Sequence, residues 1–422
     1  MNATKSSYRT RVVDRELDTL LKSVGAVVIE GPKACGKTET ALQKARSVVW
    51  LDRDLNAQQL AKAAPEVLLQ GEVPLLLDEW QLAPQLWNEV RFQVDKRSPE
   101  KGQFILTGSS TPDDDARRHS GAGRFVRLRM RPLSVFELER SSGAVSFASL
   151  MSGQEVAGVG AVLPVPELAR VIAVGGWPGS LELAAEAAQV VNQGYVDQIV
   201  ETDLPRLIGR RRDPVKLRNL LSALARSVGN QVSVSKLAHE AGGEGNALDR
   251  ATVDLYLDEL TRLNILEDLP AWNTHLRSRD ALTKAPKRMF VDPSLAVATL
   301  GASAEKILGD LEYMGFLFEN LVVRDLRVLS QPLGGRVSHA CTRDGKEVDA
   351  VVELRDGTWA AFEVKLGASW IEAGAQSLLR FANSVDTTKA GKPAALAVIV
   401  PDGYAYRRPD GVTVLPLSVL GL

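Results

Sequence analysis

Residues 31–38 form a stretch whose residue types could bind phosphate. They read GPKACGKT, which matches the pattern G-x-x-x-x-G-K-[ST]. Glycines in such a loop let successive backbone N–H groups turn inward on a phosphate, and the helix that follows adds the positive end of its dipole. We expect Lys37 to hold the β- and γ-phosphates of a nucleotide and the Thr38 hydroxyl to ligate Mg²⁺. The predicted nucleotide-binding residues of this loop are Gly31, Pro32, Lys33, Ala34, Cys35, Gly36, Lys37 and Thr38.

Two later apolar segments end in residues that could complete this chemistry. The first, VPLLLDEW, ends in two adjacent carboxylates. Asp78 suits the outer shell of the Mg²⁺ and so joins the nucleotide-binding set, and Glu79 can polarise the attacking water. The second segment, FILTGSS, ends in hydroxyl groups, so Thr107 or Ser109 could orient that water. Because no N-K-x-D sequence follows for recognition of guanine, we expect the nucleotide to be ATP.

These groups meet only if the chain forms a parallel sheet. Residues 24–30 and the two later segments read as buried strands, because their apolar residues run without alternation, and 38–46 reads as a helix. The carboxyl ends of parallel strands lie at one edge of an open α/β sheet, where such sheets bind ligands. A chance match of the loop is the alternative, and the ordered strand ends argue against it.

A second set of charged residues lies on a predicted β-hairpin near the C-terminus. Its strands are KEVDAVVEL and WAAFEVKL, joined by RDGT. The even-numbered apolar residues of the two strands share one face only if Ala350 opposes Phe362. That register needs a three-residue loop, 355–357, whose glycine takes the left-handed conformation.

The same register gathers three charged side chains on the other face of the hairpin. Asp349 lies opposite Glu363, and Lys365 follows two residues later. Two carboxylates in one place are costly unless a cation neutralises them, and a divalent metal ion would do so. A solvated charged face, with Lys365 simply paired to either carboxylate, is the alternative.

The middle of the chain reads as a connection followed by helices. Residues 141–166 are rich in Gly, Ser and Pro, which favours a domain boundary or a mobile connection, whereas the glycine-rich 174–180 has no physical assignment. Residues 232–272 read as helix, glycine turn, helix and strand. Apolar residues recur at helical spacing in the second helix. This is a winged-helix pattern.

The charges of this region do not favour DNA reading. Phosphates are repelled by a net acidic face, so a packing or regulatory role is preferred. The exposed face of the second helix offers Asp249, Asp254, Asp258 and Glu259 against Arg250 and Arg262. Upstream, 206–226 holds seven basic residues and one acidic residue. That segment could present its charge to nucleic acid or to an acidic partner, and a solvated helical surface is the alternative.

Composition describes an ordinary globular protein. Of the 422 residues, 45% are hydrophobic, and 51 basic against 52 acidic residues give no global bias towards nucleic acid or membrane. At about 100 to 200 residues per domain, this length predicts two to four domains. Cys35 and Cys341 lie in segments of different character, so no disulfide and no cysteine metal site is expected. No apolar stretch is long enough to span a bilayer and no signal peptide is present, so we expect a cytoplasmic protein without a membrane partner.

The motifs GPKACGKT, LLLDEWQLAP, ILTGSS and GRFVRLRMRPLSVFEL resemble those of prokaryotic AAA-related P-loop ATPases that carry a C-terminal domain of poorly defined role. The resemblance covers nearly the whole chain. It implies that Arg124 lies near the nucleotide as a charge-stabilising arginine, in cis or from a neighbouring subunit of a homo-oligomer. A structural salt bridge of Arg124 is the alternative. Glu39 departs from the pattern, because these ATPases more often have a small or hydroxyl residue at this position, and its carboxylate would lie close to the bound anion.

The C-terminal charged set resembles the core of the PD-(D/E)xK nucleases. The resemblance rests on Asp349, on Glu363-Val-Lys365, and on Glu319 in the predicted helix that precedes them. It implies that Asp349 and Glu363 bind Mg²⁺ and that Glu319 completes the metal shell. It also implies that Lys365 holds the attacking water or the phosphate charge.

The expected fold is therefore an α/β chain of four parts. We predict a P-loop ATPase core of AAA type in 1–140, a linker and helical region in 141–205, a helical and winged-helix domain in 206–301, and a restriction-endonuclease-like α/β domain in 302–422. The expected function is Mg²⁺-dependent ATP hydrolysis coupled to action on DNA or RNA. The competing function is a regulatory ATPase whose C-terminal domain binds a protein partner and cuts nothing.

Overall fold

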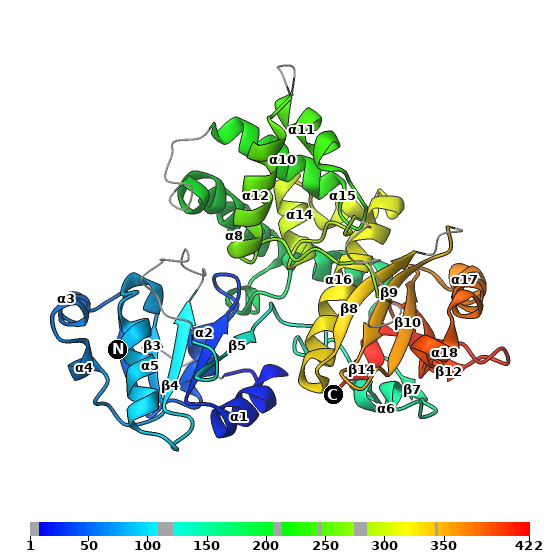
Figure 1. The fold of residues 1–422 in the computed structure, drawn as a ribbon. Coiled ribbons are helices and arrows are strands. Elements are labelled where there is room, and N and C mark those ends of the chain that lie inside the picture. Colours follow the sequence, from blue (N-terminus) through cyan, green and yellow to red (C-terminus); the bar gives the residue numbers. More distant parts are fainter. Residues whose placement is uncertain (1–7, 109–120, 206–212, 244–246, 274–284, 342–344) are drawn as a thin grey trace. The chain divides into compact units, whose positions relative to one another are not determined.

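The computed structural model describes residues 8–108, 121–205, 213–243, 247–273, 285–341 and 345–422 (Figure 1). The chain divides into two compact units. The N-terminal unit contains 1–132 together with 262–264, and the C-terminal unit contains 133–261 and 265–422. Ser109, one of the two predicted water-orienting residues, lies outside the described residues. Within the part that the structure describes, no helix is both long and apolar enough to cross a membrane.

A five-stranded parallel sheet forms the N-terminal unit, in the order β2-β3-β4-β1-β5. Its strands are β1 (Ala26–Glu30), β2 (Ser47–Trp50), β3 (Leu75–Asp78), β4 (Phe104–Gly108) and β5 (Phe125–Arg129). Both faces are covered, because Val27 and Ile29 join one apolar core while Ala26 and Val28 join another. The three predicted buried strands are confirmed as β1, β3 and β4.

Helices surround this sheet. They are α1 (Val13–Ser23), α2 (Lys37–Leu42), α3 (Leu55–Ala63), α4 (Pro65–Leu68) and α5 (Leu86–Lys96). The helix predicted after the phosphate-binding loop is α2, which is shorter than the sequence indicated. The loop therefore connects the carboxyl end of β1 to the amino end of a helix, as the motif requires.

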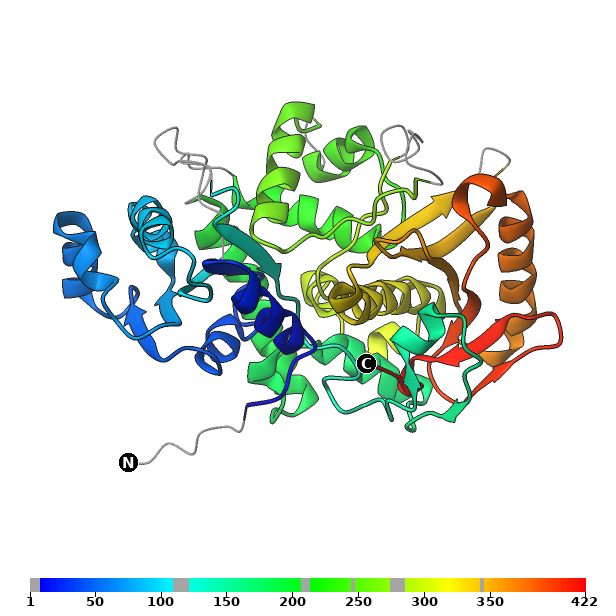
Figure 2. The same cartoon turned by 60° about the horizontal axis from the view of Figure 1, so that its bottom comes forward.

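A seven-stranded mixed sheet is the main element of the C-terminal unit, in the order β7-β12-β13-β11-β10-β9-β8. The helix α16 (Leu311–Ser330) packs on β8, β9 and β10, and α17 (Ile371–Ser384) covers β9, β10 and β11 (Figure 2). The strands are β7 (Gly158–Val159), β8 (Arg336–Cys341), β9 (Glu347–Glu353), β10 (Trp359–Val364), β11 (Ala395–Val400), β12 (Tyr404–Arg407) and β13 (Thr413–Pro416).

The segment predicted as a connection belongs to this unit instead. Within 141–166, β7 pairs with β12 at the edge of the large sheet. The short strand β6 (Val145–Ser146) pairs with β14 (Leu420–Gly421), and α6 (Phe147–Met151) follows it. The prediction of a boundary or mobile connection there is wrong, because Gly and Pro are compatible with short edge strands.

The glycine-rich stretch that lacked an assignment is a tight packing element. Gly175 has a φ of 79°, and a Cβ on Gly176 would lie 2.2 Å from the Leu133 carbonyl oxygen. The Gly176 N–H donates to Asp292 Oδ2 at 3.0 Å. The Trp177 indole N–H donates to Ser294 Oγ at 2.9 Å. The partners come from a distant part of the chain, so sequence pattern could not identify them.

Helices occupy most of the middle of the C-terminal unit. They are α7 (Val165–Val174), α8 (Ala185–Gln198), α10 (Pro214–Arg226), α11 (Val234–Gly242), α12 (Arg250–Arg262), α14 (Pro293–Thr299) and α15 (Ala304–Leu308). The backbone segments 265–271 and 285–291 pair in antiparallel fashion at Leu266–Phe290 and Leu269–Lys287. We name this pair of segments the strap.

Two sequence expectations about charge in this region change with the structure. Glu259 is buried, so the acidic face of α12 is smaller than predicted. Four of the seven basic residues of 206–226 lie outside the described residues, namely Arg206, Arg210, Arg211 and Arg212. Downstream of them, Arg218 lies 2.7 Å from Glu201, and Arg226 lies 3.3 Å from Glu240. These arginines pair with acids of their own unit, which favours the surface alternative.

The predicted hairpin register is confirmed. Ala350 pairs with Phe362, and Leu354 and Thr358 are joined by a backbone hydrogen bond of 2.8 Å that closes the three-residue loop. Gly357 has a φ of 86°, in the left-handed region. The carboxylate-bearing face is not solvated, however, because α17 covers it and Glu363 is only 5% exposed.

Candidate functional site

The loop at 31–38 has the shape of a phosphate cradle. Gly36 has a φ of 99°, and Ala34 a φ of 60°, so both adopt the left-handed conformation. A Cβ on Gly31 would lie 2.1 Å from the Met130 carbonyl oxygen, so only glycine fits there. The Lys37 ammonium donates to the carbonyl oxygens of Gly31 at 3.0 Å and Pro32 at 2.7 Å. Its buried side chain therefore folds back over the loop.

Asp78 joins the loop to the next two strand ends. Its Oδ1 accepts hydrogen bonds from Thr38 Oγ1 at 2.8 Å and from Thr107 Oγ1 at 2.6 Å. The parallel pairing of β3 and β4 sets Asp78 beside Thr107. A hydroxyl and a carboxylate side by side are oxygen donors of the kind that Mg²⁺ prefers. These residues fit the predicted Mg²⁺ of a nucleotide complex.

Glu79 begins the turn after β3 in a restricted conformation. Its φ is 55°, which is unusual for a residue with a side chain and is typical of functional positions. The Gln81 side-chain amide donates to the Glu79 carboxylate. A Cβ on Gly108, at the end of β4, would lie 2.6 Å from Gln81 Oε1. Gln81 thus lies between the two strand ends, and its place in LLLDEWQ gave no sign of this.

Arg124 lies away from the phosphate-binding loop. Its backbone carbonyl accepts from the N–H of Ala26, the first residue of β1, whereas the loop follows the last residue of that strand. The guanidinium donates to Asp95 at 2.8 Å and holds the pKa of that carboxyl below its usual range. A role in cis therefore has no geometric support, the salt-bridge alternative is observed, and a role in trans stays a prediction.

Sequence reasoning missed residues of the N-terminal stretch that support the phosphate-binding loop. Arg11 is 5% exposed, and its guanidinium donates to the carbonyl oxygens of Cys35 at 2.9 Å and Arg131 at 2.7 Å. Tyr8 Oη donates to Asp14 Oδ1 at 2.7 Å, and burial raises the pKa of the Tyr8 phenol. The N-terminal stretch carries no phosphate-binding signature, so only the packing reveals these residues.

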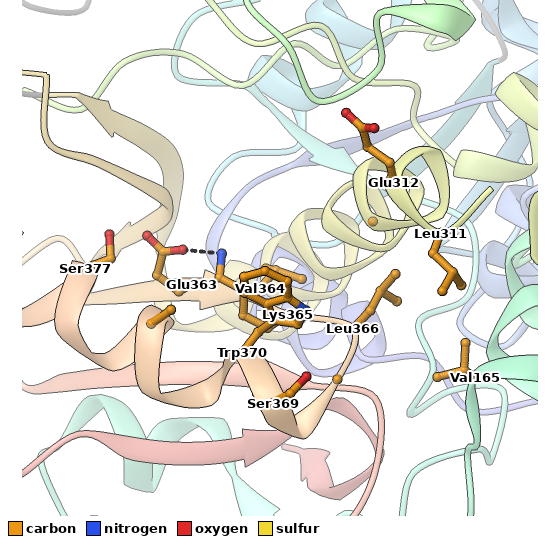
Figure 3. A pocket seen from close by; sticks show the side chains of 13 residues that line it. Val165, Leu311, Glu312, Glu363, Val364, Lys365, Leu366, Ser369, Trp370 and Ser377 are labelled. Carbon is orange, nitrogen blue, oxygen red and sulfur yellow. Dashed lines mark hydrogen bonds and ion pairs between the residues drawn. The ribbon is translucent and has the colours of Figure 1, made fainter.

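The C-terminal carboxylates converge as the register requires. Asp349 Oδ2 accepts from the backbone N–H of Val364 at 2.8 Å. The Lys365 ammonium lies 2.6 Å from Glu363 Oε2 and 3.7 Å from Asp349 Oδ2. Figure 3 marks the pair of Lys365 and Glu363 by a dashed line. Lys365 therefore pairs with both acids, which is the pairing that the sequence left as an alternative to catalysis.

A second lysine enters this cluster from the strap. The Lys287 ammonium lies 2.8 Å from Glu319 Oε1, 3.3 Å from Glu347 Oε1 and 3.7 Å from Asp349 Oδ1. Lys287 is only 5% exposed. Nothing in the sequence singled it out, because it lies in a segment remote from the hairpin.

The buried cluster shifts the titration of its members. Burial first, and then the Asp349 carboxylate, raise the pKa of Glu319 to about 8 and that of Glu363 to about 7. Burial alone would lower the pKa of Lys287, but Glu319 and Asp349 outweigh it and leave that pKa above its ordinary value. Lys287 therefore stays charged across the physiological range.

The donor set does not fit the metal that the nuclease resemblance implies. Among the described residues, no group of three or more His, Cys, Asp or Glu side chains is arranged to hold a metal ion. Glu319 and Asp349 are bridged by Lys287 instead of facing a common open point. Asp349, Glu363 and Lys365 meet, as predicted. The place of the metal that Glu319 would help to bind is filled by the Lys287 ammonium.

A cleft of about 930 Å³ opens beside this cluster (Figure 3). Glu363 and Lys365 line one side of it, and Leu311 and Leu366 contribute apolar walls. Trp370, which also lines the cleft, is 61% exposed. The charged pair therefore borders a cleft whose lining is mainly apolar but also includes Glu312, Ser369 and Ser377.

Comparisons with known families divide the chain into three matched segments. Residues 23–139 match a family described as an AAA domain. Residues 165–306 and 314–420 match two families described as domains of unknown function, DUF8612 and DUF4143. No curated protein matches the chain.

Solved structures resemble the chain at low identity. A Walker-type ATPase of Pyrococcus abyssi is 16% identical, with 70% of this chain and 97% of that chain covered and a TM-score of 0.44. Drosophila ORC bound to DNA is 13% identical, with 70% and 89% covered and a TM-score of 0.25. C. elegans PCH-2 is 14% identical, with 59% and 65% covered and a TM-score of 0.18. The AAA domain match and the cradle at the end of β1 together support ATP binding and hydrolysis by a P-loop ATPase core in the N-terminal unit.

Proposed function

We propose that the chain binds Mg²⁺-ATP at the loop 31–38 and hydrolyses it to ADP and inorganic phosphate. The observation that carries this proposal is that the hydroxyls of Thr38 and Thr107 both donate to one carboxylate oxygen of Asp78. Asp78 and Thr107 lie at the ends of neighbouring strands. The loop N–H groups and Lys37 bind the β- and γ-phosphates. Thr38 and Asp78 hold Mg²⁺, which supplies positive charge to those phosphates when it is bound.

Glu79 is proposed as the general base of hydrolysis. It accepts a proton from the attacking water while the water oxygen bonds to the γ-phosphorus. The bond from that phosphorus to the bridging oxygen breaks, and its electron pair leaves with ADP. The hydrogen bond from Gln81 holds the Glu79 carboxylate in place. Thr107 orients the water from the neighbouring strand end.

The test is release of inorganic phosphate from ATP by the full chain in the presence of Mg²⁺. We expect steady turnover in the wild type and its loss in Lys37→Ala. Equal phosphate release by wild type and Lys37→Ala would contradict the proposal.

Two functions compete for the C-terminal unit. Metal-dependent action on DNA or RNA is supported by the order α16, β8, β9, β10, α17, β11, which includes the helix, hairpin and further strand of the nuclease resemblance, and by the meeting of Asp349 and Glu363 at the Lys365 ammonium. A catalytically silent module that binds a protein partner is supported by Lys287 and Lys365, which neutralise the carboxylates. We favour the silent module, because the geometry of the acids is satisfied without a metal.

The helical region is proposed as a winged helix that packs rather than reads DNA. Its order α10, α11, α12 followed by the paired strap supports that fold. The strap corresponds to the wing, and the Trp272 N–H donates to the His339 carbonyl in β8 at 2.7 Å. A wing held on the C-terminal sheet is not available to a DNA groove.

Nucleic-acid cleavage separates the two candidates. The full chain is incubated with Mg²⁺ or Mn²⁺ and labelled single-stranded DNA, duplex DNA or RNA, with Asp349→Ala as the matched control. The silent module predicts that both proteins leave every substrate intact. Cleavage by the wild type that disappears in Asp349→Ala would establish the nuclease instead.

A further inference from the structure

We propose that Lys287 is the resident cation between Glu319 and Asp349 in the C-terminal carboxylate cluster and that it excludes a divalent metal from these two residues. The inference is independent of ATP hydrolysis, because every residue in it belongs to the C-terminal unit. It gives the silent-module alternative a specific chemical cause.

The first step is the position of the ammonium group. It lies 2.8 Å from a Glu319 oxygen and 3.7 Å from an Asp349 oxygen, so it stands between the acids that the nuclease resemblance assigns to the metal. Glu347 contributes a third carboxylate at 3.3 Å. A bound divalent ion would need the same oxygens at about 2.0 to 2.6 Å. The ammonium and the metal therefore compete for one place.

The second step is that Lys287 is fixed by its backbone. Its N–H donates to the Leu269 carbonyl at 3.0 Å, and its carbonyl accepts from the Leu269 N–H at 2.9 Å. Gln231 forms a bridge on the other side of the strand. The residue is thus paired with neighbours on two sides, and its side chain enters the cluster from a set position.

The third step is that α16, the helix that carries Glu319, also fixes the position of the strap that carries Lys287. Asn320, which follows Glu319 in α16, accepts from the Phe290 N–H at 3.1 Å and donates to the Phe290 carbonyl at 2.8 Å. This pair of bonds sets the register between the strap and α16. Lys287, three residues before Phe290, is thereby held opposite Glu319.

The fourth step concerns energy. Lys287 is only 5% exposed, so its positive charge is poorly screened. Removing one partner of a buried pair leaves the other charge uncompensated, which is strongly unfavourable. A metal that entered beside a buried ammonium would also meet unscreened repulsion. The cluster is therefore stable around the Lys287 ammonium, which lies among the carboxyl groups of Glu319, Glu347 and Asp349, and it is unfavourable for a metal.

The test is Mn²⁺ binding to the nucleotide-free full chain, measured by electron paramagnetic resonance and by calorimetry. We expect the wild type to have no Mn²⁺ site that depends on Asp349. Lys287→Met should gain one such site and bind Mn²⁺ there at least tenfold more tightly than the wild type binds it. Lys287→Met/Asp349→Asn should lose that site. Lys287→Arg is the matched control, because it keeps the cation and should bind no Mn²⁺.

Three results would overturn the inference. One is a stoichiometric Mn²⁺ site in the wild type that Asp349→Asn abolishes, and this result needs no lysine variant to fold. Another is a folded Lys287→Met protein that gains no Mn²⁺. If Lys287→Met fails to fold, Lys287→Met/Glu319→Gln removes the buried pair together. That folded double variant should bind Mn²⁺ through Asp349 and Glu363, and its failure to do so would equally contradict the exclusion.

Discussion

Thr38 Oγ1 lies 2.8 Å from Asp78 Oδ1, although 40 residues separate the two in the chain. The hydrogen bond links the end of the phosphate-binding loop to the end of β3. It unites the two halves of the predicted nucleotide site, and Thr107 adds the third strand end by bonding to the same oxygen. The ATPase proposal follows from this convergence, not from the loop motif alone.

Replacing Lys37 with alanine is expected to weaken Mg²⁺-ATP binding at least tenfold. The ammonium that caps the loop carbonyls would otherwise reach the β- and γ-phosphates. Calorimetric titration of the full chain measures the effect. Lys44→Ala is the matched control, since Lys44 lies beyond α2 and pairs with Asp18 at 2.7 Å. Equal affinities in the Lys37 variant and the wild type would remove Lys37 from the site.

Replacing Arg124 with alanine is expected to leave ATP hydrolysis unchanged at protein concentrations too low for subunits to associate. Arg124 pairs with Asp95 beside the first residue of β1, away from the nucleotide loop. Steady-state phosphate release over a range of protein concentrations is the measurement. A defect that grows as the protein is concentrated would instead assign Arg124 to a neighbouring subunit's site.

The parts of the fold that were predictable depend on contacts close in sequence. Consecutive apolar residues marked β1, β3 and β4, because strands covered on both faces need no alternation. The hairpin register followed from the alternation of apolar residues at the even-numbered positions of 348–354 and 360–366, which must share one face. Local pattern was sufficient for these elements because one slip would turn a whole apolar set to the wrong face.

The parts that were not predictable depend on contacts between remote segments. Lys287 meets Asp349 only through the packing of the strap on α16 and β8. Arg11 meets Cys35 through a fold-back of the N-terminal stretch. Neither residue belongs to a motif, and each looks like a surface cation in sequence. Their burial is a tertiary property, so sequence periodicity gave no signal for it.

Replacing Gly357 with alanine is expected to destabilise the C-terminal unit by about 1 kcal/mol, the usual cost of a side chain in the left-handed region. Its φ is 86°, and nothing lies within 4 Å of an added Cβ, so the effect isolates the backbone. Gly179→Ala is the matched control, because it has the same free space without a positive φ. Thermal unfolding compares them. Equal stability of the two variants would refute the loop conformation.

Stability of the C-terminal unit is expected to fall as pH rises from about 5 to about 8. The pKa of Glu319 is raised from 4.5 to about 8, and that of Glu363 to about 7. Between those limits the unfolded chain has released protons that the folded chain retains, so higher pH favours unfolding. The change in Tm with pH measures this, and Glu319→Gln should flatten it. A wild-type Tm that climbs through this window would show the opposite linkage.

The most direct test of the account compares ATP binding and turnover in wild type and Glu79→Gln. The variant removes the proposed base while Lys37, Thr38 and Asp78 remain, so it should keep Mg²⁺-ATP bound and slow hydrolysis about 100-fold or more. Retained radiolabelled ATP and phosphate release in a single turnover report the two quantities separately. The account predicts a trapped, unhydrolysed nucleotide in Glu79→Gln, and undiminished phosphate release by that variant would contradict it.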